Sequence, residues 1–132
     1  MEKRILDEIL IDYQAELPIR KRFLHVGTAL LRYFICHPLD FRYLEQFHNS
    51  PYGVVHRRDK LLGQEQGGEL YLDLFRQGVA QGEIKTFPLP ILFSLAFGPL
   101  LAVARDHILG FIQLNDSLID RTIGACLDAV RS

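Results

Sequence analysis

Residues 115–131, NDSLIDRTIGACLDAVR, carry the pattern that decides the fold of this chain. Projected at about 100° per residue, the apolar and small side chains of this predicted helix cover an arc of about 200°, whereas a helix on a small domain needs about 100°. The small residues Thr122, Ala125 and Ala129 lie on one flank of the arc, and large branched residues lie on the other. We therefore expect this helix to pack on its own core with one side and on another helix with the other.

The preceding stretch, residues 88–109, is apolar on every side. A helix of this kind is buried all round or crosses a membrane. Residues 86–104 contain no charged residue and are long enough to resemble a membrane span, but three prolines and Gly98 interrupt them and no second span follows. We favour a buried helix and expect no membrane partner.

Two adjacent helices with surplus apolar surface indicate a homodimer. Doubling them about a two-fold axis gives a four-helix bundle, and 132 residues hardly suffice to cover both helices in a monomer. A central hairpin inside a monomer core is the alternative. The side chains expected to face the partner are Leu100, Val103, His107, Leu118, Thr122, Ala125 and Ala129.

The remainder of the chain also places its apolar residues at helical spacing, which predicts an all-α domain of five to six helices. The first helix is expected over residues 3–16. Pro18 opens the second helix, which ends at His37-Pro38 because a residue before proline avoids the helical region. A short third helix is expected over residues 40–47.

A fourth helical region is predicted over residues 57–81, kinked at Gly67-Gly68 and capped by Gly82. At the start of the last helix, Ser117 with Asp120 resembles a capping box. No linker or internal repeat divides the chain, so residues 1–132 are taken as one domain.

The charged residues and the cysteines indicate which classes of protein this chain does not resemble. Fifteen basic against sixteen acidic residues give a net charge of −1, whereas a stand-alone nucleic-acid binder usually has a basic excess. The two distant cysteines, Cys36 and Cys126, form no disulfide framework or metal knuckle, and reduced thiols in the cytoplasm are the simplest interpretation.

Catalytic motifs are missing from the sequence, so we expect no enzyme, no cofactor and no metal. The five histidines lack the spacing of a helical metal site. A small helical enzyme that uses His48 or His107 with a carboxylate such as Glu45 or Asp106 remains a weakly supported alternative.

Aromatic residues recur on the inward faces of several predicted helices, around the interruptions at Gly67-Gly68 and Gly98-Pro99. An apolar, ring-lined cavity with a few polar anchors is typical of a small-molecule site. Dense core packing is the simpler explanation from composition alone. The residues expected to line the ligand site are Phe23, Leu30, Phe34, Phe47, His48, Tyr71, Phe75, Phe93 and Phe97.

The order of three segments resembles the C-terminal ligand-binding and dimerisation domain of the tetracycline-repressor-like (TetR) family of transcriptional regulators. These segments are residues 33–38 (YFICHP), 41–51 (FRYLEQFHNSP) and 78–85 (GVAQGEIK), followed by the apolar helix and the closing amphipathic helix. The resemblance extends over nearly the whole chain, although no single motif is diagnostic.

The resemblance implies a homodimer through the last two helices, and a small hydrophobic or aromatic effector bound among the earlier helices. It also implies that the ligand loosens a repressor from its operator DNA, by moving the helix at residues 1–16. The family's helix-turn-helix head is not recognisable here, so the chain is expected to be a fragment or a natural headless homologue that does not bind operator DNA by itself. A helical adaptor dimer with a solid aromatic core and no ligand is the rival interpretation.

Overall fold

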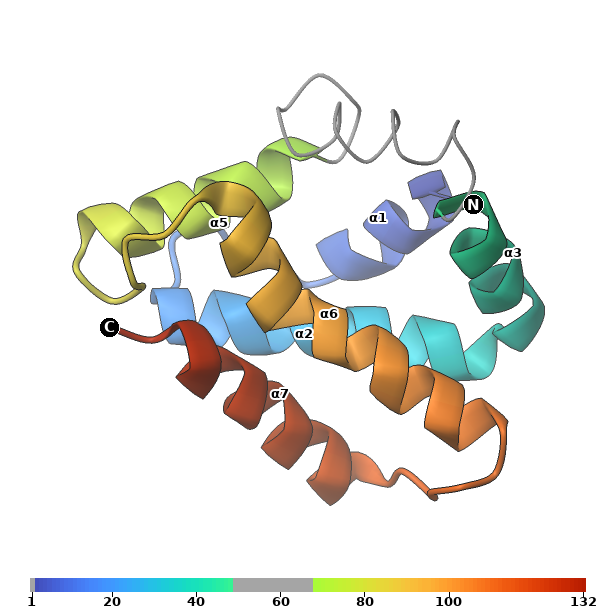
Figure 1. The fold of residues 1–132 in the computed structure, drawn as a ribbon. Coiled ribbons are helices and arrows are strands. Elements are labelled where there is room, and N and C mark those ends of the chain that lie inside the picture. The colour runs from blue at the N-terminus through green and yellow to red at the C-terminus, as the bar shows by residue number, and fades with distance from the viewer. Residues whose placement is uncertain (1, 49–67) are drawn as a thin grey trace.

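The computed structural model describes residues 2–48 and 68–132, and within them the chain forms six helices and no strand, which confirms the predicted all-α fold (Figure 1). The helices are α1 (Glu2–Leu10), α2 (Ile19–Cys36), α3 (Pro38–His48), α5 (Gly68–Ala80), α6 (Leu89–Ile108) and α7 (Asp116–Val130).

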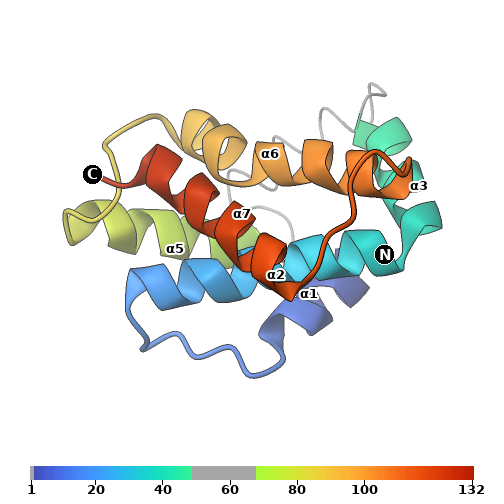
Figure 2. The same ribbon diagram turned by 90° about the horizontal axis from the view of Figure 1, so that it is seen from below.

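Helix α2 is the centre of the domain. It contacts α1, α3, α5, α6 and α7, and α6 and α7 also pack on each other (Figures 1 and 2). Its side chains Phe23, Val26 and Leu31 are fully buried. The core therefore lies around this one helix, with the other helices covering its sides.

The prolines bound α2 as the sequence predicted. Pro18 is its N-cap, and the helix ends at Cys36, since His37 precedes Pro38 and leaves the helical region with φ −131°. Pro38 then opens α3, two residues earlier than predicted, because a proline is well tolerated in the first turn of a helix.

The predicted end of the first helix is wrong. Helix α1 ends at Leu10 instead of residue 16, and Asp12 adopts the left-handed region with φ 59°. Aspartate tolerates this conformation better than most residues, so it allows the chain to turn back toward Pro18. Residues 11–17 form this turn, whereas their apolar spacing had suggested further helix.

Two helix ends follow local capping rules. Gly82, with φ 75°, follows α5 as predicted, and the Glu83 N–H donates to the Gly78 carbonyl at 2.9 Å, as in a Schellman motif. At the start of α7 the Asn115 side chain accepts from the Leu118 N–H at 2.8 Å. The capping box predicted for Ser117 and Asp120 is wrong, since Asn115 already holds the cap position and Ser117 lies inside the first turn.

The predicted segment over residues 57–67, with the first half of its kink, lies outside the described residues. Helix α5 itself begins at Gly68, the second residue of that glycine pair.

The end of the chain is fastened to the loop after α5. The Lys85 N–H donates to the Val130 carbonyl at 2.8 Å, and the Ser132 N–H donates to the Glu83 carbonyl at 3.0 Å. Ile84, 2% exposed, forms an isolated antiparallel bridge with Arg131. These contacts fix the carboxyl end of α7 beside the carboxyl end of α5.

Helix α6 is long and apolar enough, by length and composition, to cross a membrane. It nevertheless belongs to the folded core, because it contacts α2 and α7 and buries Leu92, Ala96, Phe97, Leu100 and Ala104. We therefore describe it as a core helix with one apolar face left exposed, and not as a membrane span.

Candidate effector site and pairing surface

Five aromatic rings from three helices meet in one cluster around Phe97 of α6. The Phe97 ring stacks on Phe23 of α2, with ring centroids 5.2 Å apart and an angle of 13° between the planes. Tyr71 and Phe75 of α5 approach it at 5.6 and 5.8 Å, and Phe93 lies one turn away on α6 at 5.4 Å. We call these residues, Phe23, Tyr71, Phe75, Phe93 and Phe97, the aromatic cluster.

The aromatic cluster is apolar and deeply placed. Phe23, Phe75, Phe97 and Tyr71 are all buried, whereas Phe93 is half-buried. Phe93 also meets Tyr71 edge-on at 5.4 Å. Stacked and edge-on pairs at these distances are the favourable arrangements of aromatic rings, and Phe93 is the member closest to the surface.

All five members of the aromatic cluster were among the residues expected to line the ligand site. Of the others, Leu30 is a buried core residue of α2, and Phe34 pairs with Phe41 of α3 at 5.2 Å, making a second ring contact between α2 and α3. The side chains of Phe47 and His48 lie outside the part of the structure that is described.

Sequence reasoning missed Arg22, a buried charged residue that directly precedes Phe23 of the aromatic cluster in the sequence. Arg22 is only 3% exposed, and its Nε donates to the Leu17 carbonyl at 2.9 Å. One signal was present in the sequence: Arg22 lies between Ile19 and Val26 at the helical spacing of the buried side.

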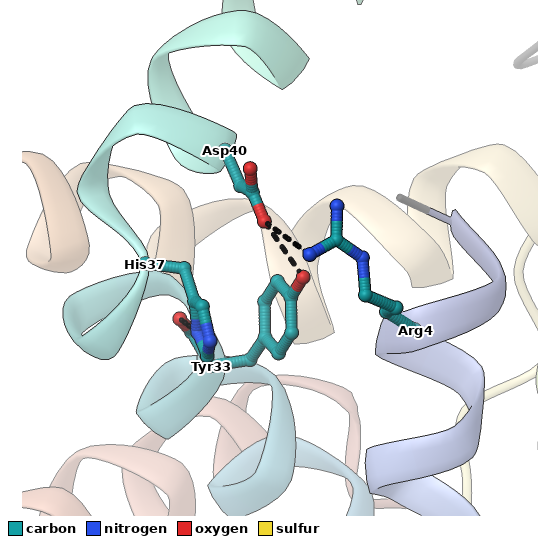
Figure 3. A network of polar contacts seen from close by, with 4 residues as sticks. All are labelled: Arg4, Tyr33, His37 and Asp40. Atoms are coloured by element: carbon teal, nitrogen blue, oxygen red, sulfur yellow. Dashed lines mark hydrogen bonds and ion pairs between the residues drawn. The ribbon is translucent and has the colours of Figure 1, made fainter.

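Helix α1 is joined to the corner between α2 and α3 by the polar network of Figure 3. The Tyr33 hydroxyl donates to Asp40 Oδ2 at 2.8 Å, and the same oxygen lies 4.0 Å from Arg4 Nη1 of α1. The His37 ring stacks on Tyr33 with centroids 4.1 Å apart, and its Nδ1 donates to the Tyr33 carbonyl. Burial, followed by the hydrogen bond and charge of Asp40, raises the pKa of the Tyr33 hydroxyl.

A second link joins the carboxyl end of α1 to α2. His25 Nε2 donates to the Ile9 carbonyl at 2.6 Å, and the Tyr13 ring contacts the His25 ring at 5.5 Å. Both ends of this short helix are therefore held by α2 or the corner that follows it.

Helices α6 and α7 each leave an apolar face exposed. On α7, Leu118, Ala125 and Ala129 are exposed and Thr122 is half-buried, all at spacings that put them on one side. On α6, Ile91, Leu95 and Ala102 are exposed. We call these seven residues the outer face.

Not every residue expected to face a partner lies there. Leu100 is 1% exposed and packs into the core on the inner side of α6. The expectation that it faces a partner is therefore wrong. Val103 and His107 are half-buried, and His107 Nδ1 accepts from the Leu114 N–H at 3.2 Å, which holds the turn between α6 and α7.

Gly124, beside the outer face, has no packing reason among the described residues, whereas Gly98 precedes Pro99, and a proline disfavours the helical region for a preceding residue that carries a Cβ. A Cβ added to Gly98 or to Gly124 would meet nothing within 4 Å, although glycine in a helix costs about 1 kcal/mol relative to alanine. By contrast, a Cβ at Gly27 would lie 2.7 Å from Ile123 Cγ2, so that glycine permits the close approach of α2 and α7.

Metal-binding groupings are not found in the described residues. No group of three or more His, Cys, Asp or Glu could hold a metal ion there. Glu45, considered above as a partner for a catalytic histidine, pairs with Arg105 at 3.0 Å.

Comparison with known proteins gives a consistent family. A family described as "Tetracyclin repressor-like, C-terminal domain" matches residues 18–131. A TetR family transcription regulator from Marinobacter aquaeolei VT8 superposes with TM-score 0.83 at 23% identity, covering 98% of this chain and 66% of that one. The sequence has no match among curated proteins.

Two further structures agree in fold. They are a putative TetR family transcriptional regulator from Vibrio parahaemolyticus (TM-score 0.68, 23% identity) and a TetR-family transcriptional regulator from Haemophilus influenzae RD (TM-score 0.77, 15% identity). The matches to these two structures cover 98% and 99% of this chain, and 68% and 67% of the matched chains. The chain thus spans about two thirds of the length of all three regulators.

Proposed function

Because the chain belongs to the tetracycline repressor-like C-terminal domains, we propose that it is the effector-sensing and dimerisation domain of a transcriptional repressor. The single observation that carries the proposal is the aromatic cluster, in which rings from α2, α5 and α6 meet and one ring, Phe93, reaches toward the surface. A small hydrophobic or aromatic effector binds there, with its apolar body against these rings.

The effector acts on DNA binding through α1. Helix α1 is held by Arg4, His25 and the buried Ile5 and Ile9, so a displacement of α2 or α3 on ligand binding is passed to it. Effectors of this kind shift such an equilibrium only by their different affinities for the two arrangements, typically about 1–3 kcal/mol. Operator DNA is read by the part of the regulator that this chain does not cover. The regulator acts in the cytoplasm.

Pairing of two copies is the second part of the proposal. The outer face on α6 and α7 would meet its symmetry mate in a four-helix bundle, and Gly98 and Gly124 would allow the backbones to approach closely. This use explains why the helix-weakening Gly124 stands where the described residues leave open space.

A pure interaction module is the alternative with an observation in its favour. Ring centroids separated by 5.2–5.8 Å around Phe97 are also what a solid aromatic core contains. In that case the chain dimerises in the same way but takes no ligand.

The effector site is tested by a thermal-shift screen of a chemically broad library, followed by titration of the hits. Phe93→Leu removes a half-buried ring of the aromatic cluster, and Phe41→Leu is the matched control, since Phe41 belongs to the other ring pair. We expect Phe93→Leu to weaken binding of the hits by about tenfold, and Phe41→Leu to leave it unchanged. No hit at all, or equal losses in both variants, would support the interaction module instead.

A further inference from the structure

The aromatic cluster is closed in this structure. Four of its rings are buried: Phe23, Phe75, Phe97 and Tyr71 are 0%, 1%, 4% and 6% exposed. Ring centroids around Phe97 lie 5.2–5.8 Å apart, so the rings touch and leave no room for another molecule between them. An effector can therefore reach more than the half-buried Phe93 only when one wall of the cluster moves.

Helix α6 is the wall that is most free to move. Helix α2 is held by contacts with every other helix, and the loop after α5 is fastened where the Lys85 N–H donates to the Val130 carbonyl. Helices α5 and α6 pack on each other less extensively than either packs on α2 (Figures 1 and 2). On its outer side α6 leaves Ile91 and Leu95 47% and 36% exposed. Movement of α6 away from α5 thus separates the rings at the smallest loss of packing.

A proline interrupts α6 directly after the aromatic cluster. Pro99 lies inside the helix and has no N–H, so the Leu95 carbonyl lacks the donor that an unbroken helix would provide. Interior prolines are the usual place of sharp helix bends. The preceding residue is Gly98, which escapes the restriction that a proline places on a residue with a Cβ. A Cβ added there would meet nothing within 4 Å, so this position has open space around it.

The half of α6 after Pro99 is tied to other elements. Arg105 pairs with Glu45 of α3 at 3.0 Å, and His107 Nδ1 accepts from the Leu114 N–H in the turn before α7 at 3.2 Å. This half is therefore fixed relative to α3 and α7, whereas the half before Pro99 carries the rings of the cluster.

We propose that residues 89–97, which we call the gate segment, form the gate of the effector site and swing about Gly98-Pro99 to admit the ligand between α5 and α6. The structure shows the closed state. Phe93, which meets Tyr71 edge-on at 5.4 Å, is the first ring that an entering ligand contacts. This inference rests on the proposed effector site and adds the way in which the site opens.

The gate is tested first without a ligand, by the rate at which iodoacetamide labels buried thiols. Leu92→Cys puts a thiol on the inner side of the gate segment, and Leu100→Cys puts one on the inner side of α6 beyond the hinge; the two leucines are 2% and 1% exposed. Cys36→Ser and Cys126→Ala remove the native thiols from both proteins. We expect labelling at position 92 to be about tenfold faster, since opening of the gate exposes it without unfolding of the domain.

Pro99→Ala, added to both proteins, restores the missing N–H and should bring the two labelling rates within about twofold of each other. Pro90→Ala is the matched control and should leave their ratio unchanged, because a proline in the first turn of a helix removes no helical hydrogen bond. Equal labelling rates at positions 92 and 100, or a ratio that Pro99→Ala does not alter, overturn the gate and leave the effector site in place.

Ligand entry is then measured by stopped-flow fluorescence with N-phenyl-1-naphthylamine, a neutral apolar probe that brightens when it leaves water. Because the gate must open first, the observed rate should level off as the probe concentration rises, and Pro99→Ala should lower this plateau by about tenfold. A rate that rises without a plateau, or the same plateau in both proteins, contradicts the gate. If the probe does not bind, the result counts against the effector site and its gate together, whereas failure of the labelling test counts against the gate alone.

Discussion

Gly27 shows how a single missing side chain sets the distance between two helices. A Cβ at this position would lie 2.7 Å from Ile123 Cγ2, and Ile123 is fully buried. Gly78 plays the same part for the loop after α5, since its Cβ would lie 2.7 Å from Ile84 Cγ1. In both cases the contacting side chain is held by its own packing, so relief would require a shift of backbone.

We expect Gly27→Ala to lower the free energy of unfolding by about 1–3 kcal/mol through this clash. Ile123→Ala should cost about 2–4 kcal/mol by leaving a cavity. The double variant should lose less than the sum, because the new methyl group enters the space that Ile123 vacates. Urea denaturation of the four proteins measures the cycle, and strict additivity would contradict the close contact.

The buried hydroxyl of Tyr33 predicts that the free energy of unfolding of the domain depends on pH. The folded state raises the pKa of its hydroxyl above the unfolded value of 10.0, by burial first and by Asp40 second, so the folded state keeps the proton more strongly. This contribution is complete below pH 10 and is lost as the pH rises through the folded pKa. The stability of wild type should therefore fall more steeply above pH 10 than that of Tyr33→Phe, as measured by urea denaturation between pH 8 and about 11.

Cys126 titrates in the same direction, since burial raises the pKa of its thiol, but it is present in both proteins and cancels in the comparison. Parallel stability curves for wild type and Tyr33→Phe would show that the hydroxyl is not held by Asp40 as described.

At the scale of elements, α1 depends on its neighbours for its structure. A helix of nine residues is not stable alone, so the buried Ile5 and Ile9 and the His25 hydrogen bond to Ile9 must hold it, while the network of Figure 3 adds a contact through Arg4. The two contacts of this network differ in their exposure to solvent. In the Tyr33–Asp40 hydrogen bond the Tyr33 side chain is buried, whereas in the ion pair with Asp40 the Arg4 side chain is 67% exposed.

Asp40→Ala should therefore destabilise the domain by about 1–3 kcal/mol, because it leaves the buried Tyr33 hydroxyl without its acceptor. Arg4→Ala should cost no more than about 0.5 kcal/mol, since an exposed ion pair is screened by solvent. Thermal unfolding compares the two, and hydrogen exchange should show faster exchange in α3 for Asp40→Ala, because the Tyr33–Asp40 hydrogen bond joins α3 to α2. A larger effect of Arg4→Ala would reverse our ranking of the two contacts.

The helical spacing of apolar residues, together with prolines, glycines and capping residues, predicted most helices from the sequence. The bounds of α6 and α7 agree with prediction within one residue, and Pro88 and Asn115 mark where these two helices begin. The end of α1 was missed because Tyr13 continues the helical spacing of Ile5 and Ile9, although the chain must turn there to reach α2. The rings of the aromatic cluster were predicted to lie on inward helix faces, as they do, but the burial of Arg22 was not predicted, since a charged residue is assigned to the surface until packing is known.

At the scale of the whole molecule, α6 and α7 bring more apolar surface than one chain covers. The outer face lies on the pair of helices that ends the domain, and Leu109 and Phe111, 52% and 74% exposed, lie in the turn between these helices. Such surface is typical of a site for another protein, and a second copy of the chain is the partner that we propose.

A dimer of this kind makes stability depend on concentration, because only the folded chain pairs. The midpoint of thermal unfolding of wild type should rise by several degrees between about 1 and 100 μM. Ala125→Arg, which puts a charge on the outer face, should abolish the rise and leave a monomer of 15.2 kDa in native mass spectrometry. Ala80→Arg, at an exposed position on α5, should behave as wild type. A concentration-independent monomer for wild type would refute the pairing.

Gly124 also bears on how such a domain evolves. Alanine at this position would add about 1 kcal/mol of helix stability, and nothing in the described residues lies within 4 Å of the added methyl group. Selection for a stable monomer alone would therefore favour alanine here, which a single-base mutation supplies, whereas selection on the paired form would favour glycine. In a descendant that abandoned pairing, this codon should be among the first to drift.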